Sequence, residues 1–170
     1  ASVAASFVHI GNHALIKGGL FMAVGGFVAA LSSRANLASF VGIGRRMPIT
    51  ATAFTVCGLS LAGLPLTAGF ISKRYLVRAI LAEDAYVIAA LVLLSSALSL
   101  IYLWKIIEVM WMQPAPVKSP NLVENPAIYL PTWIVALANI WFGVDASWLV
   151  AASRAATAAR GAPRERVLEV

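Results

Sequence analysis

Long apolar stretches, separated by short polar connections, fill most of the chain. Windows without a single Asp, Glu, Lys or Arg cover residues 18–33, 48–72, 85–104 and 125–144. A helix needs about 20 such residues to cross the hydrocarbon core of a bilayer. The pattern therefore predicts an all-α fold, a polytopic transmembrane helix bundle with about four spans.

One of these stretches is longer than a straight span requires, and it carries residues that interrupt a helix. From Pro48 to Leu81 the chain stays mostly apolar, with interruptions at Gly63-Leu64-Pro65 and again at Gly69. Pro65 lacks a backbone donor and clashes with the preceding turn, so the helix must break near it. In a membrane such a break is tolerated only where protein or a watery cavity satisfies the freed backbone groups. We therefore expect a broken helix with Pro65 and Gly69 at the break.

The other spans are continuous apolar segments bounded by polar or proline-rich connections. Four prolines between residues 113 and 126 prevent a helix from continuing there. We assign residues 1–160 to one transmembrane bundle and residues 161–170 to a polar tail. The three spans that accompany the broken helix are expected at about residues 2–31, 85–112 and 128–142.

Composition supports a membrane protein and excludes a water-soluble domain. Of the 170 residues 61% are hydrophobic and 12% charged, against roughly 45–50% and about 25% in soluble proteins. The net charge of +6 comes from basic residues between apolar segments and in the tail, which suits lipid headgroups better than nucleic acid.

Cys57 is the only cysteine and lies inside an apolar window, so the chain offers no disulfide framework. We expect no cofactor and no metal site. Because the chain starts at Ala1 in membrane-like composition without a signal-peptide pattern, it resembles a fragment or a processed product.

Charge counting leaves the membrane topology open. If residues 48–81 cross once, the basic residues of the connections lie on one side and those of the tail on the other. If they cross twice, the first connection and the tail share a side, which is what the positive-inside rule favours. The connection residues concerned are Arg34, Arg45, Arg46 and Lys118, and the tail residues are Arg154, Arg160, Arg164 and Arg166.

Three titratable residues recur at a spacing of four in the first span. His9, His13 and Lys17 form a shallow stripe on one helix face, with successive residues roughly 6 Å apart along the axis. An imidazole can accept a proton on one nitrogen and donate one from the other. Lysine can gain and lose a proton in a membrane interior because desolvation disfavours its charged form. A single such residue would be explained by snorkelling at the interface. An intramembrane cation costs about 2.5–3.5 kcal/mol, however, and three groups on one stripe predict a proton relay.

Other polar residues have alternative interpretations. A metal site from His9 and His13 lacks a nearby carboxylate and is the weaker hypothesis. Lys73 follows Pro65 by eight residues, a setting that broken helices give to transported ions. Lys73 with its neighbouring arginine could equally close a span at the interface, and spacing leaves both interpretations open. Lys105 and Glu108 are three apart near a span end and can form an interfacial pair.

Several motifs in a fixed order resemble a known family. They are His9-Ile-Gly-Asn-His13-Ala-Leu-Ile-Lys17, Met47-Pro48 before an apolar run, Ala62-Gly63-Leu64-Pro65, and Ala68-Gly69-Phe70-Ile71-Ser72-Lys73. Across residues 7–112 the order and separation of these motifs resemble the antiporter-like proton-channel family. That family comprises the large subunits of Mrp-type cation/proton antiporters, of membrane-bound hydrogenases and of respiratory complex I.

The resemblance implies a role for each site residue. It implies that His9, His13 and Lys17 lie on a central hydrophilic axis, that residues 48–81 form one broken span, and that Lys73 carries protons. The segment Asn12-His13-Ala14-Leu15 and residues 102–108 look closest to the D-type subunit of Mrp antiporters. A departure from the family pattern is Leu66, where the family commonly has a second proline. The family's first half, with an intramembrane glutamate and another lysine, is absent from the chain, which therefore holds at most one half-channel.

Three functional hypotheses follow. The leading one is proton translocation, as a transporter subunit of a multisubunit monovalent cation/proton antiporter in the cell's inner (cytoplasmic) membrane. Its partners would be other membrane subunits, the lipid bilayer, protons and Na⁺ or K⁺. The second hypothesis couples the same helices to electron transfer in a redox complex, with this chain binding no redox centre. The third is a structural membrane module whose polar stripe only packs against a partner.

Overall fold

The chain folds into a bundle of helices in a computed structural model that describes residues 2–31, 36–115 and 122–145. No β-strand occurs in these described ranges. A short 3₁₀ turn, Leu37–Phe40, precedes α2, and one turn of π-helix, Glu108–Met112, extends α5. The helices are α1 (Ser2–Leu31), α2 (Ile43–Arg46), α3 (Pro48–Ala62), α4 (Ala68–Leu81), α5 (Tyr86–Ile107) and α6 (Pro126–Val144).

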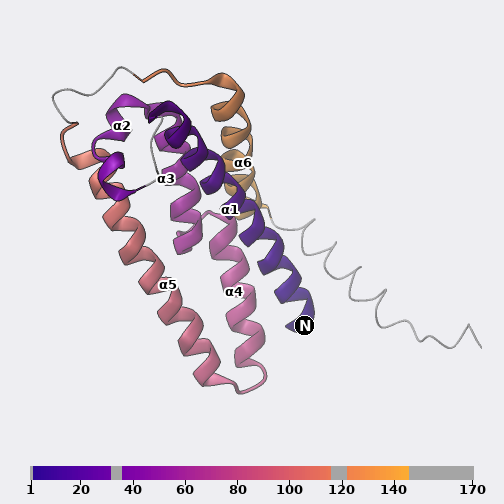
Figure 1. Cartoon of the computed structure of the whole chain (residues 1–170). Helices are drawn as coiled ribbons and strands as arrows, with labels where there is room; N and C mark the ends of the chain where they lie inside the picture. Colours follow the sequence, from indigo (N-terminus) through magenta and orange to yellow (C-terminus); the bar gives the residue numbers. More distant parts are fainter. Residues whose placement is uncertain (1, 32–35, 116–121, 146–170) are drawn as a thin grey trace, which may run out of the picture.

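Five of these helices account for the four predicted crossings. Three segments, Ser6–Leu31, Tyr86–Met112 and Pro126–Val144, are long and apolar enough to span a membrane. The apolar helix α3 is shorter, but α4 continues from its lower end in the same general direction (Figure 1). The two half-helices together make the fourth crossing. The predicted fold class, an all-α membrane bundle with a broken helix, is confirmed.

The break lies between Gly63 and Thr67, around Pro65. Gly63 ends α3 in the left-handed region at φ +91°, and its N–H donates to the carbonyl of Leu59 at 3.1 Å. Thr67 precedes α4 and its hydroxyl donates to the carbonyl of Leu64 at 2.6 Å. Gly69 makes no second interruption, because α4 runs through it from Ala68. Its missing side chain instead lets the start of α4 approach α3.

Buried polar contacts satisfy the backbone groups that the break frees. The Gly69 N–H donates to the hydroxyl of Ser60 at 3.2 Å, and that hydroxyl donates to Asn139 Oδ1 on α6 at 3.2 Å. From α1, Asn12 Nδ2 donates to the carbonyl of Ala68 at 3.0 Å. Asn12, Ser60 and Asn139 are all buried. The start of α4 is therefore held by buried polar contacts within the protein, as a membrane break requires, whereas Leu64 and Leu66 in the break itself are exposed.

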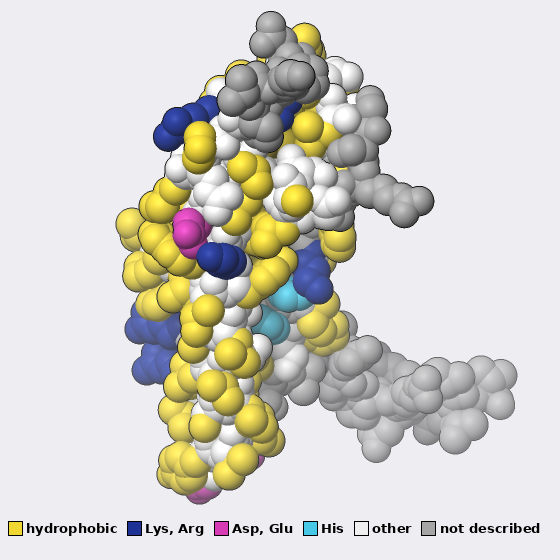
Figure 2. Space-filling view, turned by 60° about the vertical axis from the view of Figure 1, so that its left-hand side comes forward, with side chains coloured by type: hydrophobic (Ala, Val, Ile, Leu, Met, Phe, Trp, Pro, Cys, Tyr) yellow, Lys and Arg dark blue, Asp and Glu magenta, His cyan; other side chains and the backbone are white. Residues whose placement is uncertain are grey.

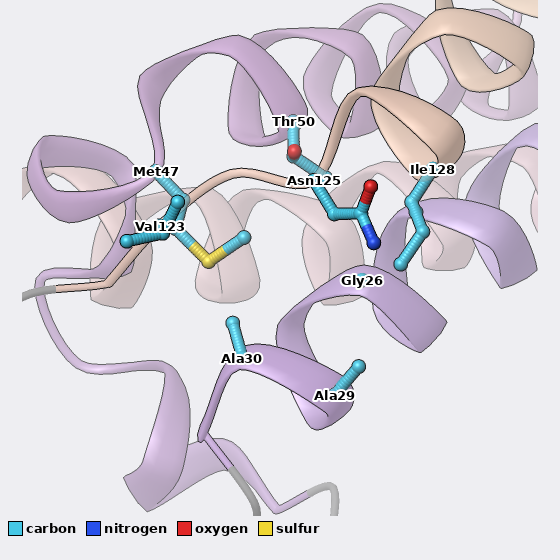
Figure 3. A pocket seen from close by; sticks show the side chains of 8 residues that line it. All are labelled: Gly26, Ala29, Ala30, Met47, Thr50, Val123, Asn125 and Ile128. Carbon is cyan, nitrogen blue, oxygen red and sulfur yellow. The ribbon is translucent and has the colours of Figure 1, made fainter.

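Apolar packing and hydrogen bonds join the connections at one end of the bundle. Phe27 packs with Ile43, Met47 and Phe54 in the main core. The Glu124 carboxylate, in the segment before α6, accepts the N–H groups of Ile49 and Thr50 at 2.9 and 2.7 Å, which caps α3. Beside this cap is a cavity of about 220 Å³ between α1, α3 and the segment before α6 (Figure 3). It is lined by Gly26, Ala29, Ala30, Met47, Thr50, Val123, Asn125 and Ile128.

Two sequence expectations differ from the structure. The last span begins at Pro126 rather than near Ile128, because the Asn125 side chain accepts the Ala127 N–H at 2.9 Å and caps the helix earlier. A single broken crossing over residues 48–81 also differs from the two crossings that the positive-inside rule favoured. That rule is a bias of loop charges, and the packing of both half-helices beside α1 outweighs it. The tail at 161–170 lies outside the described residues.

The single broken crossing predicts the sidedness of the connections. The 3₁₀ turn containing Ser39 and the segment before α6 lie at one end of the bundle, and the turn between α4 and α5, with Glu83, lies at the other (Figure 1). In a Cys57→Ser background, cysteines placed at Ser39 and Ser119 should be modified by an impermeant thiol reagent from the same side, and one at Glu83 from the opposite side. Modification of the Ser39 and Ser119 positions from opposite sides would disprove the broken span. Ser119 itself lies outside the described residues.

Candidate functional site

The two histidines of the α1 stripe face the same region of the bundle. The centroids of the His9 and His13 rings are 5.8 Å apart, as expected for residues one helical turn apart. Both side chains are partly buried, whereas Lys17 is exposed. The predicted stripe therefore brings two of its three members together, and the third lies one turn further along α1.

A hydrogen bond to α4 orients the ring of His9. His9 Nδ1 lies 3.2 Å from the hydroxyl of Ser72, and that hydroxyl donates to the carbonyl of Gly69 at 3.1 Å. A serine hydroxyl has one proton to donate. When Ser72 gives its proton to Gly69, it accepts from His9, and a neutral His9 then carries its proton on Nδ1. Its other nitrogen, Nε2, is then the one that can take up a proton.

Lys73 reaches back from α4 to the end of α3. Its ammonium group donates to the carbonyls of Leu61 and Ala62 at 2.7 and 3.1 Å. The last carbonyls of a helix have no partner within the helix and carry partial negative charge. The broken helix thus provides a site for a cation, and the lysine ammonium occupies it. A Cβ atom at Gly63 would lie 3.2 Å from Lys73 Cδ, so glycine there also leaves room for the lysine.

A cavity of about 310 Å³ connects these groups. His9, His13 and Lys73 all line it. The remaining wall comes from Leu61, Leu76 and one side of α5, where Ile88, Leu91, Val92, Ser95, Ser96 and Ser99 contribute. Both histidines are visible at the surface beside the column of hydrophobic side chains (Figure 2). Lys73 and the two histidines, which are far apart in the sequence, therefore meet at one cavity beside the break.

Sequence reasoning found the titratable residues of this cavity but missed its hydroxyls. Ser72, which orients His9, belongs to one of the family-like motifs, but nothing in its spacing indicated that contact. An otherwise aliphatic stretch is interrupted by Ser95, Ser96 and Ser99. The spacing of four between Ser95 and Ser99 was the sequence signal that could have indicated a polar helix face. Elsewhere, the predicted pair of Lys105 and Glu108 is confirmed at 3.3 Å on the exposed surface.

Known proteins share both the sequence and the fold of this chain. Residues 1–99 match the family model described as NADH:quinone oxidoreductase/Mrp antiporter, TM. The chain is 40% identical over 111 residues to the N subunit of the NADH-quinone oxidoreductase of Desulforudis audaxviator, covering 65% of the chain and 22% of that protein. It is 31% identical over 150 residues to the D-type subunit of the Na(+)/H(+) antiporter of Bacillus subtilis, covering 88% of the chain and 30% of that protein.

Two solved structures resemble this chain as well. The chain is 30% identical to a subunit of the membrane-bound sulfane sulfur reductase, an archaeal respiratory membrane complex, with a TM-score of 0.82 over 91% of the chain and 31% of that subunit. It also shares the fold of a subunit of the Mrp complex from Dietzia sp. DQ12-45-1b, with a TM-score of 0.76 at 21% identity over 89% of the chain and 36% of that subunit. The chain thus spans between about a fifth and a third of the length of the curated relatives that it matches.

Proposed function

We propose, on the premise that the chain belongs to the NADH:quinone oxidoreductase/Mrp antiporter transmembrane family, that it forms one proton half-channel of a multisubunit membrane complex. The observation that carries this proposal is the cavity shared by His9, His13 and Lys73 beside the broken helix. Titratable groups are costly inside a membrane and mark ion pathways there. Other membrane subunits are the partners, since the relatives belong to such complexes.

The geometry supports a relay in which Lys73 holds the proton and the histidines pass it on. A protonated Lys73 is stabilised by the carbonyls of Leu61 and Ala62, at the negative end of α3. When the lysine gives up its proton, that attraction weakens and the side chain is free to leave the carbonyls. His9, with Nε2 open, and His13 receive and release protons through water in the cavity. Lys17 continues the same helix beyond His13 and exchanges protons with the exposed end of the relay.

We assign the relay first to a monovalent cation/proton antiporter of the cytoplasmic membrane, with Na⁺ or K⁺ as the exchanged cation. The similarity to the antiporter's D-type subunit over 88% of the chain favours it. The second candidate is a proton-pumping subunit of a redox complex, favoured by the identity to the oxidoreductase's N subunit and by the likeness to the sulfane sulfur reductase. Purifying the complex distinguishes the two, because flavin or iron–sulfur subunits would accompany only the redox machine. A purely structural module, the third hypothesis, predicts normal transport when Lys17 or Lys73 is neutralised.

Replacing His13 tests the relay at its middle member. Without His13, His9 and Lys17 are separated by eight residues, roughly 12 Å along the helix, a gap that one water cannot bridge. His13→Gln keeps a polar side chain that can order water but cannot take up a proton, so we expect proton-coupled transport to fall by at least about tenfold. His13→Ala should lower it further, because an alanine leaves that part of the wall apolar. Proton flux in vesicles that carry the complete complex is the measurement.

The pH dependence separates a relay from packing. A histidine that carries protons imposes its own titration on the rate, so the pH–rate profile of His13→Gln should lose a step that the parent shows. If His13 only packs against its neighbours, both variants should transport at the parental rate and differ only in stability. An unchanged profile would therefore exclude a histidine relay, even with both lysines essential.

A further inference from the structure

We infer that the serine face of α5, defined as Ser95, Ser96 and Ser99, is a set of positioning residues whose hydroxyl oxygens hold the water that links Lys73 to the two histidines. This inference rests on the proposed proton channel. It adds a role for the α5 wall of the cavity, which contains no titratable residue. All three serines line the same cavity as His9, His13 and Lys73.

The hydrogen bonds of these serines fix what they offer to the cavity. The Ser96 hydroxyl donates to the carbonyl of Val92 at 2.9 Å, and the Ser99 hydroxyl donates to the carbonyl of Ser95 at 2.8 Å. Each hydroxyl has one donor and two acceptor positions. With the proton committed to the helix backbone, Ser96 and Ser99 present acceptors, which suit the hydrogens of water. Lys73 on the facing wall supplies only donors, so water between the two walls is oriented from both sides.

The cavity has the size to hold that water, and the histidines, Lys73 and the serines give the water polar partners in a wall that is otherwise apolar. Its volume of about 310 Å³ is many times the roughly 30 Å³ that one water occupies in the liquid. Large apolar cavities stay dry, whereas polar ones that offer each water several partners are filled. α5 makes its main helix contacts with α3 and α4. The histidines on α1 therefore face the serines across the cavity, and a proton crossing it needs intervening water.

The distribution of polar side chains on α5 distinguishes a water-binding role from serines that only bond to their own helix backbone. Serines in membrane helices often bond to the carbonyl four residues earlier without further function. Between Val87 and Ile101, however, the only side chains with a polar atom are these three, and all three line the cavity. The exposed side chains around them, such as Leu94 and Leu98, are aliphatic. Polar side chains thus occur on this helix segment only where it borders the titratable groups.

Isosteric substitutions test the hydroxyls in the complete complex. The pair Ser96→Thr with Ser99→Thr keeps both hydroxyls, and the pair Ser96→Val with Ser99→Val has nearly the same shape without them. We expect the valine pair to lower proton flux at least about tenfold, because a misplacement of about 1 Å in a transfer path can cost about 100-fold in rate. The threonine pair should stay close to the parent. Thr52→Val is the matched control, since the Thr52 hydroxyl donates to the carbonyl of Pro48 at 2.7 Å in the same way but lies on exposed α3 surface.

The comparison of valine with threonine decides the inference. Equal flux in the two pairs, whether both normal or both low, would overturn it, because the presence of the hydroxyls would then make no difference to transport. Lys73→Ala is measured in the same vesicles. If Lys73→Ala abolishes flux while the valine pair transports normally, the serine inference fails alone. If neither change affects flux, the proposed function fails with it.

Discussion

Replacing Lys73 with alanine is expected to reduce proton-coupled transport to background. The side chain is the one cation that the cavity's lining residues provide, and its ammonium donates to Leu61 and Ala62 across the break. Without it the relay has no group that can hold a proton at the end of α3. Assembly should persist, because the two carbonyls can bind water from the cavity in its place. Proton flux per assembled complex, measured with a pH-sensitive dye in vesicles, gives the result.

Two further variants show whether charge or proton release matters at this position. Lys73→Arg keeps the positive charge, but arginine does not lose its proton in proteins, so it should be as inactive as alanine while assembling normally. Arg74→Ala, the matched control, removes an exposed cation one residue away on α4 and should leave transport intact. Transport at the parental rate in Lys73→Ala would leave the structural-module hypothesis in place of the channel.

Replacing Gly69 with alanine is expected to destroy the folded complex rather than the relay. A Cβ atom at Gly69 would overlap the backbone oxygen of Ser60, a clash that no rotamer change can relieve. The start of α4 would have to move away from α3, and the hydrogen bond from Gly69 to Ser60 would break. We expect a loss of stability that exceeds the roughly 1–3 kcal/mol typical of an overpacked core, seen as loss of assembled complex from the membrane.

Gly25 provides the control for this effect. It lies exposed on α1 and a Cβ added there meets nothing within 4 Å. Alanine favours a helix over glycine by about 1 kcal/mol, so Gly25→Ala should be neutral or slightly stabilising in a thermal denaturation of the purified complex. The same substitution should thus act in opposite directions at the two sites. A Gly69→Ala complex as stable as the parent would contradict the close packing of the two half-helices.

The sequence predicted the parts of the fold that local chemistry decides. A proline inside a long apolar run cannot continue a helix, so the break at Pro65 was predictable, and uninterrupted apolar length predicted the other spans. Gly69 was expected to interrupt the helix as well. It lies instead in the first turn of α4, because its lack of a side chain serves contact with another helix, which a linear pattern does not reveal.

The sequence predicted only those parts of the site that depend on the geometry of a single helix. Spacing placed His9 and His13 on one face, but a four-residue step overshoots a turn of 3.6 residues by about 40°, so Lys17 is rotated by about 80° from His9. That drift explains why Lys17 is exposed and lines no part of the cavity. Spacing left Lys73 undecided between a broken-helix site and an interfacial pair, and its position beside α3 favours the former. The serines of α5 could not be assigned, because which helix faces α1 is a property of the tertiary packing.

The central claim, that protons cross the cavity between α1, α4 and α5, is tested most directly by filling it. In a Cys57→Ser background, Leu91→Cys places a thiol on the cavity wall, and Leu94→Cys places one on α5 away from it. The parent side chains are similarly exposed, at 59% and 56%, but only Leu91 lines the cavity. Each complex is reacted with a membrane-permeant, bulky thiol reagent, labelling is verified by mass spectrometry, and proton flux is compared before and after. We predict that flux stops on labelling at position 91 and persists at position 94. Undiminished flux after complete labelling at position 91 would contradict a proton path through this cavity.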